Sequence, residues 1–354
     1  MSVSSTTMTA FSEQRLVEFK RIVEGYLLSI VCICGLLGNV LTCVILSSRI
    51  MRKSTTNIYI FALSCVSSCI LIGFLLTHGI RLTFHAETFY RHIFTSIFPI
   101  HITFLFMQIY LTVIVVLDRC ILICSPFRDQ KRRSPRHAVF IVLCVSLCCI
   151  LFCILFWFEF TLIKKDNTQV IAVSKFGAHP LFRTLIGKYL YFVFVFLNPL
   201  LTILICKTMI IKKLYTVRRR KYSLGNLKKQ NRSSNAINFL VLSIVFVFLV
   251  TQFPYFIFNV LYSWFGPSLM TNLHAEQYLA INNLLLVINA SSTFILYAFF
   301  DRKFRQIGQH FLFCRPLPAG FDAQNSVTRM MLLNRHASTF VHHTKSCPAS
   351  INLI

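Results

Sequence analysis

An aspartate and an arginine stand side by side near the end of a long apolar run. The stretch reads VVLDRCILICSPFRDQ from Val115 to Gln130, and its charged pair is Asp118 and Arg119. Charges within a membrane helix are rare and usually have a polar partner or a function. Arg119 can pair with the adjacent carboxylate in one state and contact an entering partner in another. Alternatively, it only extends toward the lipid headgroups while Asp118 neutralises it; the pair alone leaves both interpretations open.

The composition indicates that the elements holding this pair are membrane helices. Of 354 residues, 56% are hydrophobic and 13% are charged, whereas a soluble domain carries about 25% charged residues. Charge-free windows recur along the chain, each near or above the roughly 18 to 20 residues of a membrane-spanning helix. Their uninterrupted apolar runs lack the alternation of apolar and polar residues that membrane β-strands show. We therefore predict an all-α membrane protein with seven helices near residues 25–49, 56–80, 94–124, 138–161, 185–213, 236–262 and 278–300.

The basic residues predict the orientation of these helices. The net charge is +25, from 36 basic and 11 acidic residues. With the N-terminus outside, the three inner loops hold 17 Lys and Arg and the outer segments hold 10. Because basic loops stay on the cytoplasmic side, we expect an outer N-terminus, an inner C-terminus and contact with membrane lipids. This distribution argues against nucleic-acid binding, and the N-terminal residues lack the apolar core of a cleavable signal peptide.

Four regions follow from these patterns. We expect an extracellular N-terminus over 1–24, a seven-helix domain over 25–300, a short eighth helix over 301–314 and a disordered cytoplasmic tail over 315–354. The eighth helix is predicted to lie on the inner membrane surface, because its apolar and basic residues alternate with helical spacing. Cys314 directly after it is a candidate for palmitoylation, or alternatively a plain cytosolic thiol.

Enzyme chemistry has little support in the chain. No His/Cys set with metal-ligand spacing, Gly-rich phosphate loop or carboxylate pair on one membrane face occurs, so we expect no enzyme, metal or cofactor. None of the 14 cysteines falls in an expected outer loop, which predicts no outer disulfide. A transporter is the rival membrane class, but its charged or unwound residues would lie near the bilayer midplane.

Several motifs resemble one receptor family. GLLGNVLTCVIL, MRKSTTNIYIFAL, FLNPLL and NASSTFILYAFFDRKFR resemble segments of rhodopsin-like (class A) G-protein-coupled receptors, over roughly residues 25–314. The most specific stretch, TVIVVLDRCILICSPFRDQKRRSPRHA, is similar to the FMRFamide and myosuppressin branch of invertebrate neuropeptide receptors, including many nematode members. FVFLVTQFPYFIFNV fits the same branch.

The resemblance implies roles for the charged pair and for two helices. Asp118 and Arg119 would form the inner switch, Pro254 the hinge of the sixth helix beside Gln252, and Tyr297 the tyrosine that ends the seventh. An extracellular ligand, by resemblance an amidated neuropeptide of the Arg-Phe-amide type, would shift helices five to seven. That shift would open an inner cleft for a heterotrimeric G protein at the plasma membrane.

The sequence also departs from the family pattern. Ser67 stands where the family has a sodium-binding aspartate, so we expect no sodium ion. Thr293 and Phe294 replace the usual Asn and Pro of the seventh helix, and the outer cysteine of the third helix is missing near Phe94. These departures keep open a chemosensory receptor for small odorants, or a receptor with weakened coupling.

Residues in the outer halves of the helices are the candidate ligand contacts. For the arginine of a peptide ligand, Glu159 and Glu276 are the two well-placed acids. An aromatic-rich wall with few polar groups fits a small amphipathic peptide; alternatively, its aromatic residues only pack the bundle. The other candidates in this wall are His78, Arg81, His101, Lys188, Tyr191, Tyr255, Phe256, Asn259, Tyr262 and Asn283.

Overall fold

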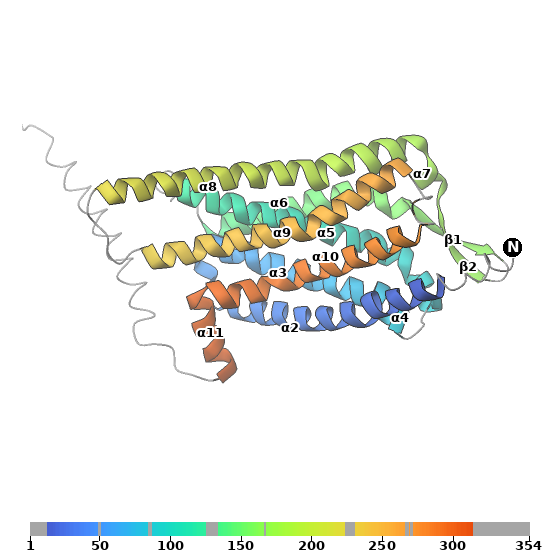
Figure 1. The fold of residues 1–354 in the computed structure, drawn as a ribbon, viewed down its shortest axis with the longest axis horizontal. Coiled ribbons are helices and arrows are strands. Elements are labelled where there is room, and N and C mark those ends of the chain that lie inside the picture. The colour runs from blue at the N-terminus through green and yellow to red at the C-terminus, as the bar shows by residue number, and fades with distance from the viewer. Residues whose placement is uncertain are drawn as a thin grey trace, which may run out of the picture. The chain divides into compact units, whose positions relative to one another are not determined.

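The described part of the chain is almost entirely helical. The structure is a computed structural model that describes residues 13–48, 51–83, 87–124, 134–165, 168–223, 231–265, 269 and 272–313. Figure 1 shows its long helices lying side by side. In chain order the elements are η1 Arg21–Leu27, α2 Leu28–Leu46, η2 Met51–Lys53, α3 Thr55–Phe74, η3 Leu75–Gly79, α4 Ile80–Thr83, α5 Glu87–Cys124, α6 Pro135–Cys153, η4 Ile154–Phe158, β1 Phe160–Lys165, β2 Thr168–Val173, α7 Lys175–Ala178, η5 Phe182–Leu190, η6 Phe192–Leu197, α8 Asn198–Ser223, α9 Asn231–Phe265, α10 Leu273–Phe300 and α11 Arg302–Phe313.

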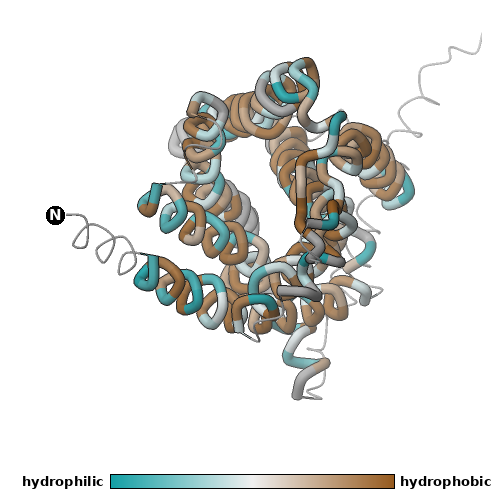
Figure 2. Tube along the Cα trace, turned by 90° about the vertical axis from the view of Figure 1, so that its right-hand side faces the viewer, coloured by the Kyte–Doolittle hydropathy of each residue, from teal (hydrophilic) through white to brown (hydrophobic). Residues whose placement is uncertain are grey.

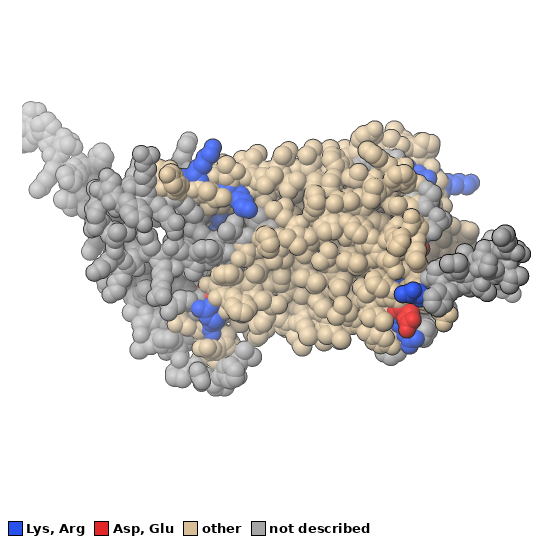
Figure 3. All heavy atoms as spheres, in the orientation of Figure 1, with Lys and Arg blue, Asp and Glu red and all other residues tan. Residues whose placement is uncertain are grey.

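The helices have the length and composition of membrane spans. Among the described residues, six helices are long and apolar enough to cross a membrane, and the shorter apolar stretch Phe246–Tyr262 lies within α9. Seen end-on, the helices consist mostly of apolar residues (Figure 2), and many of their large apolar side chains are exposed on the surface of the protein. On the face in Figure 3, charged side chains gather at the two ends and leave an uncharged middle. A wide apolar exterior of this kind is stable only in contact with lipid, and the predicted all-α membrane fold is confirmed.

The helix ends differ from the expected ones. The first helix already includes residue 13, well before residue 25, and α8 still includes residue 223, beyond residue 213. Charge-free windows mark only the part of a helix inside hydrocarbon. Outside it a helix continues through charged residues, because Glu, Lys and Arg have good helix propensity.

The first and seventh helices pack at very short range through glycines. A Cβ atom on Gly35 would overlap the Ser291 side chain, and one on Gly38 would lie 2.9 Å from the Phe294 Cβ. The side-chain amide of Asn39 donates a hydrogen bond of 3.0 Å to the Ala290 carbonyl on α10. Small residues at such an interface let two membrane helices approach closely. Close approach is needed for the van der Waals packing and the hydrogen bonds that hold membrane helices together.

An antiparallel hairpin covers one end of the bundle. Strands β1 and β2 pair from Phe160↔Val173 to Lys165↔Thr168, and the Phe160 ring contacts Phe94 and Phe98 near the start of α5. We call this the hairpin end and the opposite one the Arg119 end. The hairpin was not predicted from the sequence, although Asp166 and Asn167 stand between two apolar runs and both residue types favour turns.

Glu159 lies at the base of the hairpin. Its carbonyl oxygen accepts a hydrogen bond of 2.9 Å from the Ser174 amide, and Gly177 packs so closely on it that a Cβ would overlap this oxygen. Burial raises the pKa of the Glu159 carboxyl to about 7, and Arg183 opposes this rise. The carboxyl is therefore only partly ionised at neutral pH.

We predict that Gly35→Val destabilises the bundle, because the added methyl groups must push α2 away from α10. Overpacking of this kind reduces stability by about 1–3 kcal/mol. Thermal unfolding of the detergent-solubilised protein measures the effect. Leu37→Val is the control, because Leu37 is 67% exposed on the same helix; an equal loss in both variants would contradict the packing argument.

A second prediction concerns pH. Because the folded-state pKa of Glu159 is raised, the folded protein binds more protons than the unfolded chain between about pH 4.5 and 7. Stability contributed by this group is therefore present at low pH and falls as the pH rises through 7. We expect Glu159→Gln to reduce the difference in unfolding temperature between pH 5 and pH 8. An unchanged difference would show that Glu159 is ionised across this range.

Candidate functional site

The Arg119 end contains the charged pair. Asp118 accepts hydrogen bonds from the hydroxyls of Thr55, at 3.3 Å, and Thr56, at 2.5 Å, both in the first turn of α3. Arg119 is only 8% exposed and interacts electrostatically with Tyr297 of α10. The structure therefore ties the acid to α3 and brings the arginine toward α10.

Tyr297 lies in the core at this end. It is 1% exposed, its ring centroid lies 5.8 Å from that of Phe304, and its hydroxyl has no hydrogen-bond partner within the described ranges. A buried hydroxyl without a partner is unfavourable by about 1–3 kcal/mol.

A cavity opens among the helices nearer the hairpin end. The space is narrow, with room for about one water molecule, and is partly open to solvent; it is much smaller than a usual ligand pocket. Polar atoms come from Tyr191, Gln252 and Tyr255, and the two tyrosine side chains interact with each other. The remaining lining is apolar: Ile102, Leu105, Phe106, Ile109, Val195 and Leu286.

Three of the expected contacts on α9 lie elsewhere. Phe256 stacks on Phe196 with a centroid distance of 3.3 Å. The Asn259 amide donates to the Tyr255 carbonyl one turn earlier at 2.8 Å, and Tyr262 is 38% exposed. None of the three lines the cavity, because spacing along one helix does not reveal which face the neighbouring helices cover.

Pro254 ties α9 to its neighbour. It lies inside α9, where its ring removes a backbone hydrogen bond. The Tyr278 hydroxyl of α10 donates a hydrogen bond of 2.9 Å to the Pro254 carbonyl. Gln252 is 8% exposed and lines the cavity two residues before this proline, so cavity and proline share one turn of α9.

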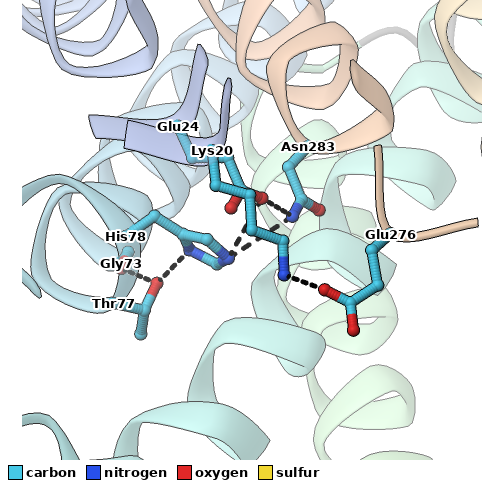
Figure 4. A network of polar contacts seen from close by, with 7 residues as sticks. All are labelled: Lys20, Glu24, Gly73, Thr77, His78, Glu276 and Asn283. Carbon is cyan, nitrogen blue, oxygen red and sulfur yellow. Dashed lines mark hydrogen bonds and ion pairs between the residues drawn. The ribbon is translucent and has the colours of Figure 1, made fainter. Parts of the chain in front are cut away.

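A polar network joins the first, second and seventh helices at the hairpin end (Figure 4). The Asn283 amide donates to the Glu24 carboxylate at 2.7 Å and lies 3.3 Å from His78 Nε2. Lys20 and Glu276 form an ion pair of 2.6 Å. Asn283, His78 and Glu276 were among the residues expected from the sequence, whereas residue 24 was only the end of the expected N-terminal segment 1–24.

His101 lies beside this network. Its ring packs edge-on against Phe74 with a centroid distance of 4.5 Å, and a Cβ on Gly73 would lie only 3.0 Å from it. The ring nitrogen Nε2 is buried without a hydrogen-bond partner among the residues described. Phe74 thus separates His101 from His78, which lies 5.5 Å from the same ring.

The remaining expected residues are distributed differently. Glu159 lies under the hairpin and outside the cavity lining, and Arg81 stacks over the Tyr90 ring at 4.2 Å. The Lys188 side chain and Cys314 lie outside the described residues. Ser67, at the expected sodium position, is fully buried and accepts a hydrogen bond of 3.2 Å from Gln108.

Comparison with known proteins agrees with this arrangement. Residues 38–296 match the model of the seven-transmembrane receptors of the rhodopsin family. The FMRFamide receptor of Drosophila melanogaster is 26% identical over 297 residues, a match that covers 80% of this chain and 52% of that protein. The chain thus spans about half the length of this curated relative. Because the family match covers more than half of the chain, the chain belongs to the seven-transmembrane receptor (rhodopsin) family and is a multi-pass membrane protein.

Proposed function

We propose that this protein is a plasma-membrane receptor that binds an extracellular amidated peptide and activates a heterotrimeric G protein. The proposal takes the hairpin end as extracellular and the Arg119 end as cytoplasmic. The excess of Lys and Arg in the segments assigned to the Arg119 end supports this orientation.

One observation carries the proposal: the cavity and the buried Arg119 lie on the same helix, α5. Ile109 lines the cavity, and Arg119 follows ten residues later, about 15 Å along the helix axis. Helix α9 also lines the cavity, and its proline lies within the same turn. A ligand that changes the packing of α9 against α5 therefore changes the environment of Arg119, which is how binding at one end biases a two-state equilibrium at the other.

The peptide ligand is inferred from the relative and from the cavity. The relative is named for FMRFamide, a peptide with two aromatic side chains and one arginine. Tyr191, Tyr255 and Phe106 in the cavity wall suit an aromatic side chain of such a peptide. The network of acids and bases at the hairpin end offers polar partners for the rest of it.

A second candidate is a chemosensory receptor for a small apolar molecule. The observation favouring it is the cavity lining, which is mostly aliphatic and includes neither Glu159 nor Glu276. A small odorant that widened this space would bind without touching the polar network. The two candidates differ in whether an amidated peptide activates the receptor.

We predict that Arg119→Ala abolishes most of the G-protein response of cells that express the receptor. The reason is that Arg119, released from its buried position, would contact the G protein directly. The measurement is G-protein activation by a panel of peptides ending in Arg-Phe-amide. Antibody binding to an N-terminal tag on intact cells reports surface level and orientation together.

Arg52→Ala is the matched control, because Arg52 is an exposed arginine at the same end, next to the start of α3. It should retain the response. A full response in Arg119→Ala would contradict the assigned switch. Silence of the wild-type receptor across the panel, at normal surface level, would instead favour the small apolar ligand.

A further inference from the structure

Glu24 is a buried carboxylate with an incomplete set of partners. It is 6% exposed, and its Oε1 atom accepts a hydrogen bond from Asn283. The other close group is His78, whose Nε2 lies 3.8 Å away. Within the described ranges, no Lys or Arg nitrogen lies within 4.0 Å of it, and Oε2 accepts no hydrogen bond. A buried carboxylate needs a cation or several donors to offset its desolvation.

The neighbouring charges do not fill this role. Lys20 lies one turn before Glu24 on the same helix, but its ammonium contacts Glu276 at 2.6 Å. Glu276 therefore already has its cation. Glu159, the other acid expected to bind a cation, has its pKa raised to about 7 by burial and lies near Arg183. Glu24 is thus the acid at this end best suited to bind a cation from a ligand.

Three helices hold the carboxylate in place. Glu24 belongs to the π-helical segment η1, His78 to the π-helical segment η3 and Asn283 to α10. The Thr77 hydroxyl binds the Gly73 carbonyl at 2.7 Å and lies 2.8 Å from His78 Nδ1, which orients the imidazole (Figure 4). π-helical segments are rare and often occur at functional sites, and here two of them face each other.

The polar groups around the carboxylate lie near the cavity along two helices. Asn283, which binds Glu24, lies three residues before Leu286, a residue of the cavity wall, and therefore on the same face of α10. On α5, His101 lies four residues before Leu105, which also lines the cavity, so these two residues share one face of that helix. One helical turn, about 5.4 Å, separates the polar groups from the cavity along each helix.

We infer that Glu24, held by Asn283 and flanked by His78, binds the guanidinium of an arginine in the peptide ligand. This inference rests on the proposed function and assigns to Glu24 the specificity for a cationic side chain. The aromatic residue next to that arginine packs toward the cavity wall, which must widen to accept it, since neighbouring residues of a peptide need neighbouring subsites. A guanidinium matches a carboxylate with two parallel hydrogen bonds, which a lysine or a neutral residue cannot reproduce.

The test is a double-mutant cycle between receptor and peptide. Phe-Met-Arg-Phe-amide is compared with its analogue in which citrulline replaces arginine, a neutral side chain of similar shape, on the wild type and on Glu24→Gln. On the wild type, citrulline should lower potency by about 10- to 100-fold, as expected for a charge-assisted pair. On Glu24→Gln the two peptides should be nearly equipotent, with the arginine peptide weakened to the level of the analogue.

Two further variants serve as controls for position. Glu18→Gln removes an exposed charge from the same helix, and Glu159→Gln removes the half-buried acid under the hairpin. Both should retain the wild-type preference for arginine. A preference that survives in Glu24→Gln, or that disappears in Glu159→Gln instead, would overturn the assignment.

The remaining outcomes are also decisive. If Glu24→Gln does not reach the cell surface, Asn283→Lys gives the same readout, because the new ammonium occupies the carboxylate and should remove the preference for arginine. A wild-type receptor that responds to neither peptide contradicts the proposed function, and the inference with it. A wild-type receptor that responds equally to both peptides retains the peptide function but contradicts the subsite.

Discussion

The structure depends on one constraint: charged side chains and backbone polar groups without hydrogen-bond partners are excluded from the hydrocarbon core of the bilayer. Within a bilayer each segment must satisfy its own backbone hydrogen bonds, so the spanning segments are helices. Charged side chains are confined to their ends, as the face in Figure 3 shows. Chemistry in this molecule is therefore divided between two polar ends, with a nearly uncharged bundle between them.

Because the two ends are far apart, packing must connect them. The first and seventh helices are held at fixed distance by Gly35, Gly38 and the Asn39 hydrogen bond to Ala290. The sixth helix is less constrained, because Pro254 interrupts its backbone hydrogen bonds while its carbonyl is bound by Tyr278. The fold thus combines a tightly packed pair of helices with one whose backbone can bend beside the cavity.

The polar network at the hairpin end shows how a membrane bundle accommodates an acid. Lys20 and Glu276 form an ion pair with side chains 30% and 26% exposed, whereas Glu24 lies deeper and relies on the Asn283 amide and on His78. Exposed pairs of this kind contribute little to stability. A deeply placed carboxylate with few partners is the more specific feature, since its interaction with a cation is less screened by water.

Much of the fold could be read from the sequence. Charge-free windows marked the spanning helices, and the pattern around Asp118 and Arg119 indicated the receptor family. Helix ends could not be placed in this way, because the windows record the limits of the hydrocarbon and not of the helix, as residues 13–20 show. The hairpin was missed because its short strands pair only with each other, outside the apolar blocks.

The sequence by itself determined the class of the protein, because hydrophobicity and charge act locally along the chain. Tertiary structure decided which side chains face one another. Glu24 and Asn283 are 259 positions apart, and their hydrogen bond exists only because the first and seventh helices are neighbours. Phe256 and Tyr255 are adjacent in the chain, yet the first stacks on Phe196 and the second lines the cavity. Such differences arise from the rotation of each helix against its neighbours, which depends on packing across the whole bundle.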